Sequence, residues 1–304
     1  MTFRGARTGG TPKLFPLIVC CALLSAGDAI AQPSTKQARN AIRRMAGFNL
    51  TDGAVRVKTV AGDGSAAEVT ADVRTVFRLE QDQASNWRVA EIRTGQDSWE
   101  SVYLLGKATG VNFASDECNA PDPAFKGSAA VDPSVKRARC LLGALTGIDV
   151  PSDGVRIQEV EPFAVPLASQ SSATVVAWIR VATRLVKDGK AWQVSELRTG
   201  NRDWIKLQPL VEALNAQKRA QALSDMELVA QALERYRQDR GFYVVSDSHA
   251  VLIDHLTPRY LTKVIRVDPW SHPYEYEGQR ERFSLRSSGP DHKGSTADDI
   301  VLNR

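Results

Sequence analysis

The sequence predicts an α+β protein. Two tandem repeats, each a helix followed by an antiparallel meander, are expected to precede a long helix with a small antiparallel sheet. Three observations predict this. The chain repeats itself with an offset of about 100 residues, and in each copy a segment with helical spacing precedes segments with period-two alternation. An amphipathic stretch over residues 207–240, with one apolar stripe, then follows the second copy.

The duplication is clearest around two tryptophans. Residues 87–95 (WRVAEIRTG) return as residues 192–200 (WQVSELRTG), and Trp99 and Trp204 follow at the same spacing. With two copies and a period near 100 residues, the pattern indicates a tandem domain and not a solenoid.

Each copy shows the same order of elements. Helices are expected at residues 36–47 and 134–146, with Gly47 and Gly147 as C-terminal stops. Period-two alternation with Val, Ile, Thr and Trp predicts strands at residues 55–60, 69–79, 87–92, 155–160, 173–186 and 192–197. The Asp-Gly pair within residues 187–190 predicts a hairpin turn. On pattern alone, each copy resembles a small cystatin-like or nuclear-transport-factor-like domain.

A chain of 304 residues is expected to contain two or three units. We predict a signal peptide at residues 1–31, repeat 1 at 32–105, repeat 2 at 134–206, and a C-terminal domain at 207–304. Glycine and proline break the periodicity of residues 106–133, which are predicted to be a linker.

The first residues predict export. Basic residues precede a short apolar run at residues 14–24, and Ala29-Ile30-Ala31 offers the small residues that a signal peptidase reads. We predict cleavage after Ala31; the alternative is lipidation at Cys20 or Cys21. The mature chain is then expected to be periplasmic or secreted, without a transmembrane segment.

Two cysteines, Cys118 and Cys140, remain after such cleavage. An even count in an oxidising compartment predicts a disulfide, which would stabilise the fold by about 3 kcal/mol. The alternative is two unpaired thiols. Neither cysteine has a neighbouring histidine in a nucleophile pattern, so a catalytic thiol is not expected.

Charge and histidine usage limit the function. The formal net charge is +4, and no basic stripe interleaved with aromatics indicates nucleic-acid binding. No histidine precedes residue 249, which excludes His-based acid–base chemistry in either repeat. The repeated Glu91 and Glu196 are interpreted either as part of a polar pocket floor or as members of cross-strand ion pairs. The repeated tryptophans are interpreted as core anchors or as the lining of a ligand groove.

The C-terminal residues carry three motifs: Asp268-Pro269-Trp270, Ser288-Gly289-Pro290-Asp291 and Asp298-Asp299-Ile300. Together they resemble the C-terminal domain of type II secretion system protein G, the major pseudopilin, over roughly residues 215–304. The resemblance implies a pseudopilin-like sheet behind the long helix. Ser271 stands where the family usually has glycine, and the two repeats stand where a pseudopilin has its long apolar N-terminal helix.

Within this domain, residues 252–261 predict a short helix and a turn. Residues 274–277 and 282–286 predict an antiparallel pair of strands.

The last loop is the candidate metal site. Asp291, Asp298 and Asp299 place three carboxylates within nine residues, and Gly289 and Gly294 permit sharp turns between them. Converging carboxylates repel one another, and a hard cation such as calcium relieves the repulsion. The resemblance implies that these three aspartates bind calcium, with backbone carbonyls near Ser287 and Ser288 completing the site. The alternative is an acidic surface loop that binds no ion, and the nearby histidines are expected to be solvated.

The sequence therefore predicts a non-enzymatic, exported protein with a calcium-stabilised C-terminal module and partners in the cell envelope or a secretion apparatus. The alternative is a periplasmic small-molecule-binding or hydrolytic protein that uses a pocket in the repeats. An enclosed pocket would favour the alternative, and tryptophan-filled cores would favour the first hypothesis.

Overall fold

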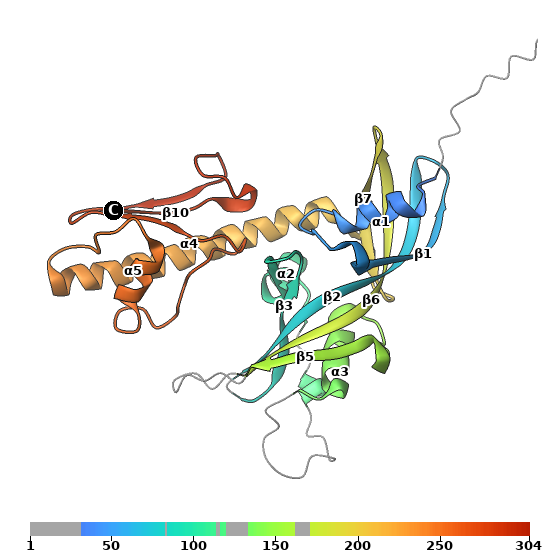
Figure 1. Cartoon of the computed structure of the whole chain (residues 1–304), viewed down its shortest axis with the longest axis horizontal. Coiled ribbons are helices and arrows are strands. Elements are labelled where there is room, and N and C mark those ends of the chain that lie inside the picture. Colours follow the sequence, from blue (N-terminus) through green and yellow to red (C-terminus); the bar gives the residue numbers. More distant parts are fainter. Residues whose placement is uncertain (1–31, 83, 114–115, 120–132, 162–170) are drawn as a thin grey trace, which may run out of the picture.

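The computed structural model describes residues 32–82, 84–113, 116–119, 133–161 and 171–304. The predicted signal peptide lies outside the described residues, as does much of the predicted linker. Both repeats contribute to one eight-stranded antiparallel sheet, and a separate three-stranded antiparallel sheet lies near the C-terminus. One long helix, α4, runs between the two sheets (Figure 1). The predicted α+β class is confirmed.

Every helix and strand predicted in the repeats is present. The first copy contains α1 (Thr35–Arg43), β1 (Val55–Gly62), β2 (Ala66–Gln81), β3 (Trp87–Arg93), β4 (Trp99–Ser101) and α2 (Val102–Thr109). The second copy contains α3 (Val135–Thr146), β5 (Val155–Glu161), β6 (Ser172–Asp188), β7 (Ala191–Thr199) and β8 (Ile205–Lys206), which leads directly into α4 (Leu207–Arg240). α2 extends past the boundary predicted for repeat 1, into the predicted linker.

The helix ends follow local signals, with one exception. Gly147 ends α3 and Gly241 ends α4, both in the left-handed conformation with φ of 70° and 80°. The prediction that Gly47 ends the first helix is wrong, because α1 stops at Arg43. There the carbonyl of Arg43 accepts a hydrogen bond from the Leu50 amide at 3.1 Å, which closes the helix with the following loop.

The large sheet is built around one long strand pair. β2 and β6 are antiparallel from Ala66↔Val186 to Glu80↔Ser172. β1 and β3 share the other edge of β2, one pairing with its first part and one with its last. β5 and β7 share the other edge of β6 in the same way. The sheet therefore has two equivalent halves, related by an approximate local two-fold axis near the middle of the β2–β6 pair.

Each half of the sheet has a core made from both copies. On one half, which we call the α3 half, α3 packs on β3 and the adjoining strands, and Leu142 contributes from one copy while Trp87 contributes from the other. On the α1 half, Ile42 of the first copy packs with Trp192 of the second. Trp87 and Trp192 are 1% and 8% exposed, which confirms that they are core anchors. Figure 1 shows α1 and α3 near opposite ends of the long strands.

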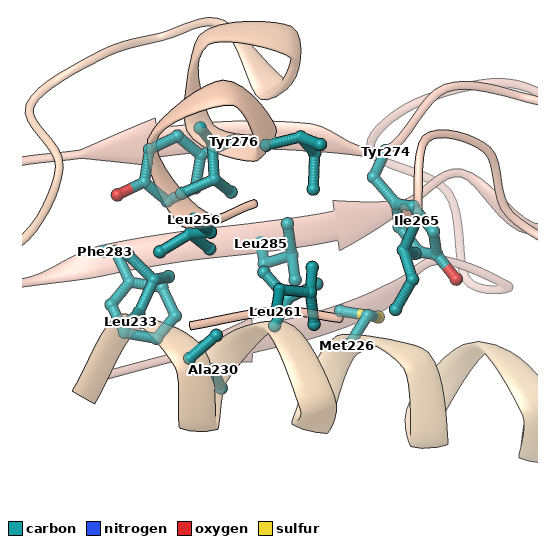
Figure 2. Packing of buried hydrophobic residues seen from close by; sticks show 14 of the residues in the cluster. Met226, Ala230, Leu233, Leu256, Leu261, Ile265, Tyr274, Tyr276, Phe283 and Leu285 are labelled. Carbon is teal, nitrogen blue, oxygen red and sulfur yellow. The ribbon is translucent and has the colours of Figure 1, made fainter. Parts of the chain in front are cut away.

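The C-terminal module packs a sheet on the second part of α4. It contains α5 (His249–Leu256), β9 (Glu275–Gly278), β10 (Phe283–Ser287) and β11 (Ile300–Asn303), in the sheet order β11-β10-β9. Figure 2 shows Met226, Ala230 and Leu233 of α4 facing side chains of the sheet. The predicted helix and strand pair are confirmed, whereas β11 was not predicted.

Two polar contacts join the described residues of this region to the large sheet. The ammonium of Lys218 on α4 lies 2.7 Å from the carboxylate of Glu100 on β4, and both side chains are largely buried. The Trp99 amide donates to Ser271 Oγ at 3.5 Å, while the indole of Trp270 donates to Asn215 at 3.0 Å and so ties the same turn to α4.

A disulfide joins Cys118 of the short 3-10 turn η2 (Asp116–Asn119) to Cys140 of α3, with a sulfur–sulfur distance of 2.05 Å. The predicted pairing is confirmed. We expect the variant Cys118→Ser/Cys140→Ser to lose about 3 kcal/mol of unfolding free energy in urea titrations, because its unfolded chain is less restricted. A midpoint equal to that of the wild type would contradict the expectation.

A second prediction concerns pH. His249 is 8% exposed and packs against the ring of Tyr274 at 5.7 Å between centroids. Burial, followed by the charge of Arg266, lowers the pKa of His249 from 6.5 to about 4. The unfolded state then binds the proton more tightly than the folded state. The contribution of His249 to the unfolding free energy is therefore constant above pH 6.5 and is lost as pH falls towards 4.

We expect this histidine alone to lower the unfolding free energy by about 2 kcal/mol between pH 7.5 and 4.5. Urea titrations at both pH values measure the loss, and His249→Phe should reduce it by that amount. His255→Gln, at a more exposed histidine, should leave the loss unchanged. Equal pH dependence in the wild type and His249→Phe would contradict the prediction.

Candidate functional site

The acidic loop lies between β10 and β11, whose pair Ser287↔Ile300 closes its two ends. Gly289 has φ of 63°, and a Cβ there would come within 2.6 Å of the Asp298 carbonyl oxygen. This glycine therefore permits the first turn of the loop to approach the last.

The three predicted aspartates converge on one hydroxyl. Thr296 Oγ1 lies 2.7 Å from an oxygen of Asp298, 3.2 Å from one of Asp299 and 3.4 Å from one of Asp291. A hydroxyl has a single hydrogen to donate, so it cannot satisfy three carboxylates. The loop thus gathers negative charge that its central side chain does not neutralise.

The remaining contacts of the aspartates are mostly with the backbone. Asp298 accepts from the Asp291 amide at 3.2 Å, and Asp299 accepts from the Ser295 amide at 2.8 Å. The guanidinium of Arg286 lies 3.8 Å from a carboxylate oxygen of Asp299, which is near the outer limit of an ion pair. The hydrogen bond from Thr296 is the main cause that lowers the pKa of Asp298, so this carboxyl is ionised at neutral pH.

Ser287 and Ser288 use their side chains elsewhere. Ser287 Oγ donates to Asp268 at 2.5 Å, and Ser288 Oγ lies 3.1 Å from His272 Nδ1. Both side chains are therefore engaged, and the backbone carbonyls near Ser287 and Ser288 stay predicted ligands.

Carboxylate, hydroxyl and carbonyl oxygens are the donors that calcium prefers, so the residue types fit this ion. In the structure, the distances from the three carboxylates to Thr296 Oγ1 are those of hydrogen bonds. Over the described ranges, no three His, Cys, Asp or Glu side chains are arranged as metal ligands.

One residue organises the neighbouring turn and was not singled out from the sequence. Asp268 is 3% exposed and accepts hydrogen bonds from the amides of Trp270 and His272, each at 3.0 Å. An Asp that precedes a turn and bonds amides further on is a known local signal. In the same turn, Ser271 takes φ of 68°, so it keeps the left-handed conformation that favours glycine.

The repeated glutamates form cross-strand ion pairs. Glu91 lies 2.5 Å from Arg78, and Glu196 lies 2.7 Å from Arg184. Each arginine also stacks on a tryptophan, Trp99 or Trp204, at 4.4 and 4.1 Å from the ring centroids. The ion-pair interpretation is confirmed, and these two tryptophans lie at the surface, partly exposed.

The described part of the repeats also contains an open groove of about 860 Å³ between α1, β7 and the start of α4. Its lining is mixed, with apolar, amide and charged side chains. We call it the α1 groove.

The C-terminal module, with a long helix packed on a small antiparallel sheet and an acidic last loop, has the organisation expected of a pseudopilin C-terminal domain. Residues 209–303 match the family described as type II secretion system (T2SS), protein G. No curated protein and no solved structure matches the chain significantly. The family match confirms the resemblance for the C-terminal region and points to a non-catalytic structural component related to secretion, in the envelope or outside the cell.

None of the helices in the described residues combines the length and the apolar character needed to cross a bilayer.

Proposed function

We propose that this chain is an exported, non-enzymatic component of a type II secretion apparatus, in which calcium rigidifies the C-terminal module and the repeats provide interaction surfaces. The role in secretion is supported by the family match of residues 209–303, and the calcium site by the convergence of three carboxylates on the Thr296 hydroxyl. A divalent cation would neutralise charge that the surrounding side chains leave in place.

The loop also contacts the long helix, which explains how an ion there would act on the whole module. Arg219 of α4 donates to the carbonyl oxygens of Asp298 and Asp299 at 3.3 and 3.5 Å. Fixing the loop therefore fixes β11 against β10 and the sheet against α4, which presents a rigid surface to partners.

We expect calcium to raise the melting temperature of the exported full chain by several degrees relative to chelator, since a ligand at 100 times its Kd adds about 2.7 kcal/mol. The variant Asp291→Ala/Asp298→Ala should lose this increase. The matched control Asp247→Ala/Asp254→Ala removes two exposed carboxylates outside the loop and should keep it.

Superimposable melting curves in calcium and in chelator would refute the calcium site. Partners are tested separately by crosslinking the tagged chain in its native envelope. Recovery of secretion-system subunits supports the proposed role, and their absence from the crosslinked products would contradict it.

A further inference from the structure

The two halves of the large sheet differ at one equivalent place. On the α3 half, η2 covers the outer edge of β3 beside α3; we call these four residues, Asp116–Asn119, the plug. On the α1 half, the equivalent place beside α1 and β7 is the α1 groove. Among the described residues, the groove is thus the open counterpart of a site that the chain fills with its own segment elsewhere.

Hydrogen bonds and a disulfide hold the plug. The side-chain amide of Asn119 accepts from the Trp87 amide at 2.8 Å and donates to the Trp87 carbonyl at 3.0 Å. Arg137 of α3 donates to the Cys118 carbonyl at 3.2 Å, and the disulfide joins Cys118 to Cys140.

Each residue that receives the plug has a counterpart in the α1 groove. The N-caps Ser34 and Ser134 align the two helices, so Gln37 corresponds to Arg137 and Asn40 to Cys140. The pairs Gln81↔Trp87 and Lys187↔Trp192 align the strands, so Trp192 corresponds to Trp87. The three counterparts, Gln37, Asn40 and Trp192, all line the groove.

The backbone of Trp192 faces the groove. The amide of Lys187 donates away from β7, to the Ser65 carbonyl at 3.0 Å, as the amide of Gln81 donates away from β3. Directly opposed residues in an antiparallel ladder either bond each other or both point outward. The N–H and C=O of Trp192 therefore point outward, and such an edge is a template for another chain.

The charge of the groove is complementary to the charge of the plug. Arg44, Lys190 and Lys206 line it against a single acid, Glu196. The plug on the other half begins with two acidic residues. An acidic occupant is therefore favoured electrostatically.

We propose that the α1 groove binds a short acidic turn of a partner protein, whose asparagine side chain bonds to the backbone of Trp192 as Asn119 bonds to Trp87. The partner segment would copy the chemistry of the plug, without its disulfide because Asn40 stands where Cys140 would be. This site is independent of the acidic C-terminal loop.

The probe is a synthetic peptide with the sequence of residues 111–122, including its cysteine. The exported full chain carries Asn40→Cys, at an exposed position, with its native disulfide verified by mass spectrometry. In glutathione redox buffer, we expect the mixed disulfide with this peptide to form at least tenfold faster than with a peptide scrambled around the cysteine. The control Lys36→Cys, exposed on the same helix outside the groove, should show no preference.

A peptide with alanine in place of the asparagine should also lose the preference. Binding without crosslinking is measured by fluorescence anisotropy of a labelled peptide with serine in place of cysteine, and Lys206→Glu should weaken it at least fivefold. Equal rates for native and scrambled peptides would overturn the proposal. So would a concentration-dependent dimer that Lys206→Glu dissociates, since the groove would then belong to a second copy of this chain.

Discussion

Residues 32–119, expressed without the second copy, are expected not to fold as a monomer. The two cores of the large sheet take residues from both copies. Without α3, Trp87 and the apolar side chains around it would be exposed, and without β7 and the end of β6, α1 would lose its packing surface. The burial lost in either core exceeds the few kcal/mol by which a domain is stable.

Far-UV circular dichroism and NMR dispersion of this fragment measure the effect, and mixing with residues 133–304 should restore the folded sheet. Trp87→Ala in the fragment should prevent reconstitution, whereas Arg88→Ala, at an exposed position on the same strand, should not. A homodimer is compatible with the expectation, because two copies of β2 can pair as β2 pairs with β6. A folded monomer of residues 32–119 would disprove it.

Lys218→Met is expected to destabilise the full chain strongly. The side chains of Lys218 and Glu100 are 8% and 15% exposed, and burial raises the pKa of Glu100 while Lys218 opposes that rise. Removing the lysine leaves a buried carboxylate without its partner, which costs about 3–5 kcal/mol of unfolding free energy. Because the pKa of Glu100 then rises further, the variant should recover stability as pH falls and lose it as pH rises.

Urea titrations give the magnitude. Adding Glu100→Leu to Lys218→Met should restore most of the loss, since no unpaired charge remains buried. Arg88→Met breaks the exposed pair with Glu80, at 3.8 Å, and should cost less than about 1 kcal/mol. A Lys218→Met variant as stable as Arg88→Met would show that the junction does not depend on this ion pair.

The local structure of the repeats was predictable because it follows from short-range patterns. Period-two alternation located the six longer strands to within a few residues but missed the short strands β4 and β8, and the duplicated sequence around Trp87 and Trp192 identified both core anchors. The exchange between copies was not predictable in the same way. Alternation shows which side chains of β3 are buried, but not that the helix covering them is α3 and not α1.

Two failures have local causes. Gly47 has φ of 81° but lies in the turn after α1, because the loop closes the helix earlier, at Arg43. β11 is a four-residue strand that follows an acidic loop, and its pattern is too short to be distinguished from a coil.

The acidic loop was predicted by residue type and spacing, and the structure brings its three aspartates to one point. The hydroxyl of Thr296 lies at that point. Its role was not predicted, since a threonine in a polar loop carries no signal of its own. Asp268 belongs to a motif that the sequence did reveal, yet its role depends on Ser287, 19 residues later, which only the fold brings near.

The two-fold relation between the halves of the large sheet also bears on how many partner segments one chain can bind. A symmetric assembly of two identical subunits must display every feature twice, once for each subunit. Here one polypeptide encodes both halves, so mutation could seal one opening with η2 and leave its twin accessible. Binding at the α1 groove, as proposed, would therefore attach one partner segment to this sheet and not a symmetric pair.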